Sequence, residues 1–209
     1  MNRIAVVSAL AWGGLTGVAA AQKVSIGLHG ALGDYREVSQ NLRYRGTGGG
    51  AALWVSYHKL SAEGSFTRVS YDPKSGGLQS FKATQLDARV GYDVAAGVTA
   101  EVGVIKRTVD PALSAQEMGA GRIGVRYVKQ IGPGTTVGLR GNYLPGAKFT
   151  GQGSAGLAFE LGLLLSAGPT NGRYRFTGDY GFQRVDRKVN GIKAPIEQSL
   201  VRIGVAVGF

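Results

Sequence analysis

Arginines and carboxylates recur at alternate positions within segments of the sequence that are otherwise apolar or small. Buried charges persist only where they are paired and hydrogen-bonded, so such a set predicts ion pairs inside the fold. The alternative is a narrow pore lined by arginines, which would prefer anions. We call this set the inner charge network, and its residues are Glu63, Asp87, Arg89, Glu101, Arg122, Arg126, Arg140, Glu160, Arg175, Asp179 and Arg202.

Little else in the sequence could support catalysis or hold a cofactor. The chain has two histidines and no cysteine. His29 shares the face of the inner charge network, where a hydrogen-bonded interior histidine is a simpler interpretation than a general base, and His58 falls in a short turn. A protease or lipid deacylase that acts through a histidine needs it beside an acid or a nucleophile, and neither histidine can be placed in such a set; no metal-ligand or phosphate-binding spacing is present. We therefore expect no catalytic residue, no cofactor and no metal, and a lipid-modifying or proteolytic enzyme is the least favoured function.

The elements that carry these charges alternate with a period of two, which predicts β-strands. Each is 9 to 12 residues long, close to the ~9–11 residues of a tilted strand that crosses the hydrocarbon core of a membrane. Small residues stand between the charges and leave room for long side chains. Many of them are glycines, of which the chain has 35. The ten segments are 23–32, 49–57, 60–71, 84–92, 98–106, 119–128, 136–144, 155–166, 173–184 and 199–209.

The connections alternate in length, which predicts short periplasmic turns at one end and longer extracellular loops at the other. Ten strands joined in this way have both termini at the short-turn end. The short connections are 58–59, 95–97, 130–135 and 167–172. The long connections are 33–48, 72–79, 110–118, 145–154 and 185–198.

Alternation alone would also fit a water-soluble β-protein, but the distribution of charge argues against that alternative. A soluble barrel places its charges outside, whereas here they avoid the apolar face and stand on the other one. That pattern suits a barrel surrounded by lipid. Aromatic residues also fall near both ends of the apolar face, as in the girdles of membrane barrels: Tyr57, Tyr92, Tyr127 and Phe209 at one end, and Phe66, Tyr143 and Phe182 at the other.

The first residues have the pattern of a cleaved signal peptide. Arg3 supplies a positive charge, residues 4–18 carry none, and Ala19, Ala20 and Ala21 are small residues before a cleavage site. A membrane anchor is the alternative, but the run contains glycines and lacks a basic flank. We therefore expect a signal peptide over residues 1–21 and one barrel domain over residues 22–209.

The signal peptide, the alternating strands and the ending Val205-Ala206-Val207-Gly208-Phe209 resemble the small outer-membrane β-barrels of Gram-negative bacteria, the OmpA/OmpX/OmpW-like and opacity-protein group. The resemblance implies an all-β, closed antiparallel transmembrane barrel in the outer membrane. It also implies that Phe209 is a signal read by the barrel assembly machinery. Many members have eight strands, so eight is the alternative to ten.

Charge outside the lumen suggests a partner. The formal net charge is +11, but nucleic acid is excluded because the arginines lie on barrel strands without a basic-aromatic binding motif. Arg68, Lys82, Lys106 and Arg184 fall at loop ends with outward parity, where they could bind the phosphates of outer-membrane lipids, including lipopolysaccharide. A solvated rim is the alternative.

These expectations define two functions. The first is a monomeric structural or surface-interaction barrel, which stabilises the lipopolysaccharide layer, adheres to a surface or docks an envelope component, with a lumen filled by ion pairs. The second is a small passive channel for anionic solutes.

Overall fold

The computed structural model describes residues 22–74, 79–111, 117–150, 154–170, 172–189 and 191–209. The predicted signal peptide, residues 1–21, lies outside the described residues. None of the helices in the described ranges is long and apolar enough to cross a membrane.

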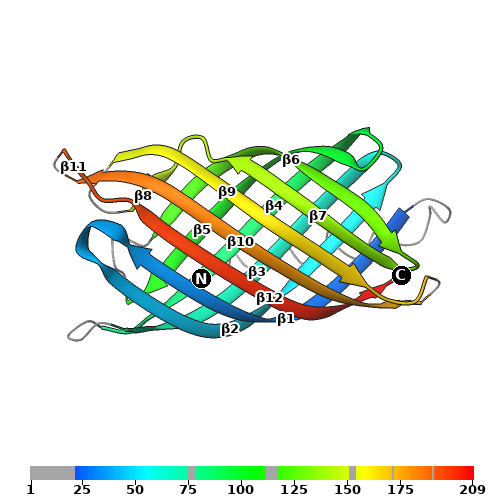
Figure 1. Ribbon diagram of the computed structural model, residues 1–209, viewed down its shortest axis with the longest axis horizontal. Coiled ribbons are helices and arrows are strands. Elements are labelled where there is room, and N and C mark those ends of the chain that lie inside the picture. The colour runs from blue at the N-terminus through cyan, green and yellow to red at the C-terminus, as the bar shows by residue number, and fades with distance from the viewer. Residues whose placement is uncertain (1–21, 75–78, 112–116, 151–153, 171, 190) are drawn as a thin grey trace, which may run out of the picture.

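Ten long antiparallel strands close into a barrel, which confirms the predicted architecture and strand number (Figure 1). Two-residue strands β8 (Lys148–Phe149) and β11 (Ile192–Lys193) and the short helix η1 (Val38–Gln40) lie in the loops. The barrel strands are β1 (Gln22–Glu37), β2 (Leu42–Tyr57), β3 (Leu60–Pro73), β4 (Phe81–Ala95), β5 (Val98–Asp110), β6 (Met118–Gly132), β7 (Thr135–Tyr143), β9 (Ser154–Ala167), β10 (Tyr174–Val189) and β12 (Ile196–Gly208).

The barrel closes between its first and last strands. β1 and β12 pair in continuous antiparallel register from Ser25 with Gly208 to Glu37 with Ile196. Closure leaves no strand edge facing lipid, which a membrane-spanning sheet requires. The start of β1, the C-terminus and the short turns lie at one end of the barrel, and the longer loops lie at the other (Figure 1).

The outer surface of the half nearer the short turns is apolar. Its exposed side chains form a continuous band of the kind that faces hydrocarbon in membrane barrels. We call this band the apolar belt, and its larger members are Ile26, Leu28, Leu32, Leu53, Phe66, Leu86, Val90, Val102, Val104, Ile123, Val125, Leu139, Leu161, Leu163, Leu165, Phe176, Ile203 and Val205.

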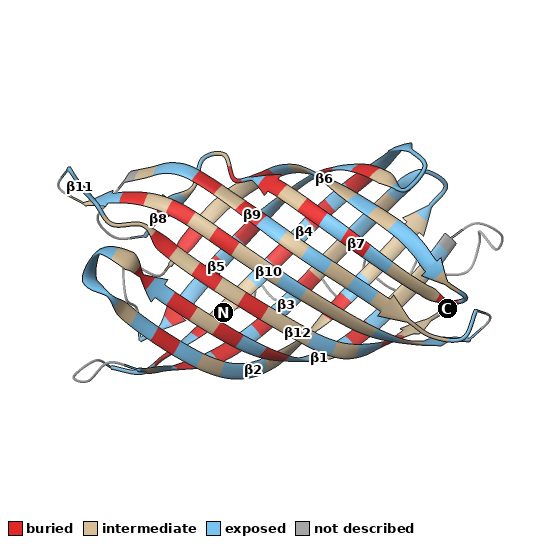
Figure 2. Cartoon of the chain, viewed as in Figure 1, coloured by how far each residue is buried: buried red, intermediate tan, exposed pale blue. Residues whose placement is uncertain are grey.

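Beyond the apolar belt the strands continue toward the loops, and their polarity inverts. Tyr35 and Tyr44 face inward with 1% and 4% exposure, whereas Asp34, Arg43 and Arg45 on the same two strands lie on the outside. We call this loop-side extension the collar. Figure 2 shows the buried positions gathered toward the loop end. At this hairpin the collar is built as a soluble barrel is, with aromatic side chains within and charged side chains without.

The collar corrects the predicted loop over residues 33–48. β1 runs to Glu37 and β2 begins at Leu42, so most of that segment is a paired hairpin. The prediction followed the outward apolar face, which ends where the collar begins. The alternation itself continues, but with the apolar residues pointing inward.

Glycines in the collar hairpin let neighbouring groups approach closely. A Cβ added to Gly48 would lie 1.9 Å from the backbone oxygen of Arg68, and one added to Gly33 would lie 2.3 Å from the hydroxyl oxygen of Tyr71. Gly64 differs, because a Cβ added there would have no neighbouring atom within 4 Å. A side chain at position 48 on β2 would therefore clash with the neighbouring strand, whereas one at position 64 would not.

We predict that Gly48→Ala impairs folding, because the added Cβ must push β2 away from the β3 backbone. Overpacking of this kind costs about 1–3 kcal/mol. Gly64→Ala is the matched control and should fold as the unmodified chain does. The measurement is the fraction of refolded protein that shows heat-modifiable gel mobility, and equal fractions for the two variants would contradict the prediction.

Candidate functional site

The loop-side part of the inner charge network centres on Arg122. Its guanidinium on β6 bridges the carboxylates of Asp87 on β4 and Glu160 on β9. Arg89 lies 3.7 Å from Glu160. The amide nitrogen of Asn142 donates to Glu160 over 3.1 Å. Two acids and two arginines are therefore held together in the middle of the lumen.

A second group lies nearer the short turns and crosses the barrel. Arg140 on β7 places Nη2 2.8 Å from Glu63 Oε2 on β3, and Nε 2.9 Å from Glu101 Oε2 on β5. Arg126 on β6 places Nε 3.2 Å from Glu101 Oε1. β3 and β7 are four strands apart around the sheet, so Arg140 connects distant walls of the barrel.

Arg202 joins the network from β12. Its Nε donates to Asp179 Oδ1 on β10 over 2.8 Å, and its Nη1 donates to Ser65 Oγ over 3.4 Å. Ser65 Oγ is in turn 3.5 Å from Asp87 Oδ2. Each of the five predicted lumen acids thus has an arginine partner.

Arg175 is the exception among the predicted lumen residues. It lies inside the barrel on β10, where its Nε donates to Ser166 Oγ over 2.8 Å and its Nη2 donates to the Gly134 oxygen over 2.9 Å. Within the described ranges it has no carboxylate at ion-pair distance. The structure therefore does not bring Arg175 into the ion-paired part of the network.

The collar is filled by an aromatic cluster. The Tyr35 ring contacts those of Tyr44, Tyr71 and Phe81 edge-on, with centroids 5.8 to 6.3 Å apart, and Tyr71 stacks on Phe81 at 5.0 Å. Burial raises the pKa of the Tyr35 hydroxyl, so this phenol stays neutral. Around the cluster are apolar residues from other strands, including Ile105, Met118 and Leu144.

Two further buried arginines were missed in the sequence. Arg107 donates through Nη1 to Gln183 and Gln198, and its guanidinium lies 5.7 Å from the Tyr35 ring centroid. Arg187 lies 3.7 Å from Glu37 and over the Phe149 ring. Both continue the inward parity of their strands, but they lie beyond the predicted strand ends. Extending the parity past the apolar belt would have found them.

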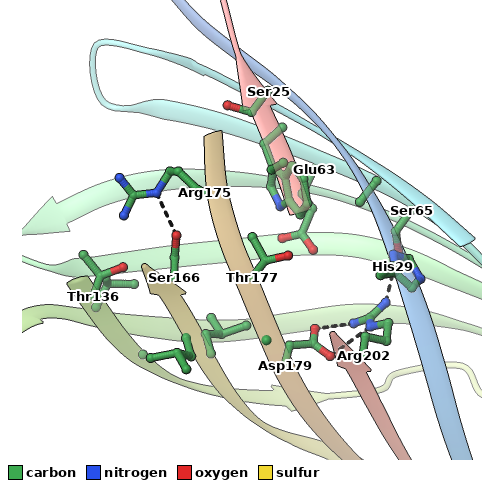
Figure 3. Close-up of a pocket in the computed structure, with 18 of the residues that line it drawn as sticks. Ser25, His29, Glu63, Ser65, Thr136, Ser166, Arg175, Thr177, Asp179 and Arg202 are labelled. Atoms are coloured by element: carbon green, nitrogen blue, oxygen red, sulfur yellow. Dashed lines mark hydrogen bonds and ion pairs between the residues drawn. The ribbon is translucent and has the colours of Figure 1, made fainter. Parts of the chain in front are cut away.

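The free space in the lumen differs between the two halves. Beside Arg89, Arg122 and Gln198 a hollow measures only about 30 Å³, room for about two water molecules. Toward the short turns, two hollows of about 320 and 250 Å³ share Trp54 and Glu63 as lining residues. Figure 3 shows the larger one, with Arg175 at one end and the Asp179–Arg202 pair at the other.

Neither histidine lies at the loop end. His29 faces the lumen, where its Nε2 lies 2.9 Å from Thr67 Oγ1. His58 occupies the β2–β3 turn at the opposite end from the loops and packs edge-on against Tyr57. No group of three or more acidic or histidine side chains in the described part of the chain could hold a metal ion.

Outside the barrel, the four predicted rim cations divide into two kinds. Arg184 places Nη1 3.0 Å from Glu197 and Nε 3.1 Å from Asp186, so its guanidinium is already paired with carboxylates. Arg68, Lys82 and Lys106 are exposed on the adjacent strands β3, β4 and β5. Across the described ranges these three have no carboxylate at ion-pair distance.

An apolar hollow of about 770 Å³ lies in the same part of the wall, between strands β2 and β6. Small outward positions on β3, β4 and β6, namely Gly64, Ala88 and Gly121, form its floor, and Val102 and Val104 on β5 also line it. Lys106 follows Val104 by two positions on the same strand face. Lys106 therefore stands beside the loop-side end of an indentation in the apolar belt, and Arg68 and Lys82 lie farther toward the loops.

No family model matches the chain, and no curated protein matches its sequence. Solved structures match its fold. An outer membrane channel from Pseudomonas putida F1 aligns with a TM-score of 0.56 at 13% identity, over 94% of this chain and 98% of that one. The outer membrane protease OmpT from Escherichia coli aligns with a TM-score of 0.51 at 8% identity, over 90% and 97%.

Neisserial surface protein A gives a TM-score of 0.44 at 16% identity, over 89% of this chain and 97% of that one. At these identities the likenesses concern the fold. The fold is that of the outer-membrane β-barrels of Gram-negative bacteria, as the C-terminal pattern predicted. With its apolar belt and charged interior, the chain is an integral outer-membrane β-barrel.

We predict that Arg140→Met destabilises the barrel by about 3–5 kcal/mol, because Glu63 loses its 2.8 Å partner inside the lumen. Arg184→Gln is the matched control. It breaks ion pairs on the outer surface and should cost under about 1 kcal/mol. Urea-induced unfolding of the lipid-reconstituted barrel measures the loss of stability in each variant. Similar midpoints for the two variants would refute the predicted difference between the inner and outer ion pairs.

Proposed function

We propose that this barrel is a structural element of the outer membrane that binds the phosphate groups of outer-leaflet lipids, foremost lipopolysaccharide. The observation that carries the proposal is the position of Arg68, Lys82 and Lys106. Three exposed cations, without carboxylate partners in the described ranges, stand on adjacent strands on the loop side of an apolar hollow, and Lys106 is two residues beyond its lining residue Val104. We call these three residues the cationic rim.

Cations at this level suit the boundary between hydrocarbon and headgroups. The apolar belt ends at Phe66 on β3 and Leu86 on β4, and Arg68 follows Phe66 by two residues. A long basic side chain here can reach a lipid phosphate while its stem packs on apolar surface. Each basic residue near an anionic membrane surface contributes about 1 kcal/mol.

The apolar hollow supplies the second half of a lipid site. A phosphorylated lipid needs an anion-binding group at the interface and an apolar surface below it for the acyl chain. Gly64, Ala88 and Gly121 lower the barrel surface between larger neighbours, so a chain can pack against it closely. Arg184 does not contribute to the lipid site, because Glu197 and Asp186 already neutralise it.

The packing of the lumen supports a structural role over a passive channel. The aromatic cluster fills the collar, and the inner charge network reduces the adjoining hollow to about 30 Å³. A hydrated anion would have to displace paired groups such as Arg122 and Asp87 to pass. The arrangement of His29 and His58 likewise favours a protein without catalytic activity.

Assembly follows from the same architecture. We propose a monomer, because closure pairs every barrel strand with two neighbours of the same chain. The Phe209 side chain points outward with 74% exposure, and its backbone nitrogen donates to the Val24 oxygen over 2.8 Å. An outward terminal aromatic ring on the closing strand is available to the barrel assembly machinery before β1 and β12 pair.

We predict that Arg68→Gln with Lys106→Gln weakens lipopolysaccharide binding by about 30-fold, because two contributions of about 1 kcal/mol are lost. The measurement is the lipopolysaccharide retained by the barrel in neutral phosphatidylcholine nanodiscs as its concentration is varied. Lys59→Gln with Lys129→Gln is the control, since it removes the same charge at the short-turn end. Equal retention by the two double variants would refute the proposed site.

We predict that the mature chain, residues 22–209, stays electrically silent in planar bilayers. Heat-modifiable gel mobility first establishes that the inserted protein is folded, and a porin in the same bilayers is the positive control. Steady, anion-selective openings would contradict the closed lumen and support the channel as the function.

A further inference from the structure

The hollow in the short-turn half of the lumen has the character of a small-molecule site. Its volume of about 320 Å³ falls at the lower end of the range for such sites, which are mainly apolar with a few convergent polar groups. We propose that it binds a small organic anion that carries an apolar chain, entering from the periplasmic end. The hollow is separate from the cationic rim, which lies on the outer surface at the other end.

The walls of the hollow are suited to an apolar chain. Its apolar lining comes from four strands and includes Trp54 on β2, Val128 on β6, Leu164 on β9 and Ala206 on β12. Gly27 makes room for the indole, because a Cβ there would lie 2.9 Å from Trp54 Cζ3. Glycine at position 27 therefore lets the Trp54 ring lie close against the β1 backbone.

The charge of the lining favours an anion. Arg140 and Arg202 are neutralised by Glu63 and Asp179, which line the same hollow. Arg175 is different, since its described hydrogen-bond partners are a serine hydroxyl and a backbone carbonyl, both neutral. Arg126 also lines the hollow and is paired with Glu101. Within the described ranges, Arg175 is therefore the lining guanidinium without a carboxylate partner, and it matches one carboxylate on an apolar chain.

The layout places these groups in order along the lumen. In Figure 3, Arg175 lies with Ser166 and Thr136 at one end of the hollow, and His29, Ser65 and Arg202 lie at the other. Arg175 is opposite Ala206, close to the C-terminal end of β12, whereas Asp179 is opposite Arg202, deeper in the barrel. The inner end is closed by ion-paired groups, so a ligand would enter and leave through the periplasmic end.

The test uses Trp54 as a reporter. The chain has two tryptophans, and Trp12 lies in the predicted signal peptide, so the mature chain 22–209 contains Trp54 alone. In phosphatidylcholine nanodiscs, octanoate should change Trp54 fluorescence saturably, with a midpoint at about 1 mM or below. Octanol, which has the same chain and no charge, should bind at least about 10-fold more weakly.

Two variants separate binding from partition into the bilayer. Arg175→Gln should raise the octanoate midpoint at least about 10-fold, whereas Lys129→Gln, which removes an exposed charge at the same barrel end, should not. Thr177→Phe fills the hollow while keeping Arg175, and should abolish the saturable change. Heat-modifiable gel mobility establishes that each variant is folded.

A response that stays linear to about 10 mM would overturn the proposal. An equal response to octanol, or an unchanged midpoint in folded Arg175→Gln, would overturn it as well. None of these outcomes affects lipopolysaccharide binding at the cationic rim, so the two proposals fail separately.

Discussion

The structure depends on one constraint, that no backbone polar group may face hydrocarbon without a hydrogen-bond partner. The chain meets it by closing β12 onto β1 in unbroken register from Ser25–Gly208 to Glu37–Ile196. Closure with ten strands fixes a narrow lumen and assigns every second residue to it. The apolar belt and the inner charge network are therefore the two faces of the same wall.

In the middle of a narrow lumen, buried charges are stable only when they are paired. Arg122 and Arg140 reach carboxylates on other strands across the interior, because a charge buried alone at this depth would be strongly unfavourable, whereas Arg175 lies nearer the short-turn end and is only partly buried. The collar solves the same packing problem with aromatic rings, since its outer surface meets water and can carry the charges instead. The change from an ion-paired interior to an aromatic interior marks the level where the strands leave the hydrocarbon.

Most of the wall was predictable, because a period of two assigns residues to faces without knowledge of their partners. The ten strands, the short-turn end and the inward parity of the network residues follow from it. The strand ends on the loop side were not predictable in this way. Beyond Leu32 the apolar side chains of the strand point inward instead of outward. Tyr35 and Arg107 were overlooked for that reason, and the predicted loop over residues 33–48 was wrong.

The sequence by itself determined the compartment, the closed antiparallel wall and which charges face inward, because these follow from local alternation and composition. Only the tertiary structure decided which arginine meets which carboxylate, because partners such as Arg140 and Glu63 lie four strands apart and meet through the curvature of the sheet. The same curvature leaves Arg175 beside Ser166 without an acid in the described ranges, and the strand order sets Arg68, Lys82 and Lys106 on three adjacent strands. These groupings depend on register and closure, which no single segment specifies.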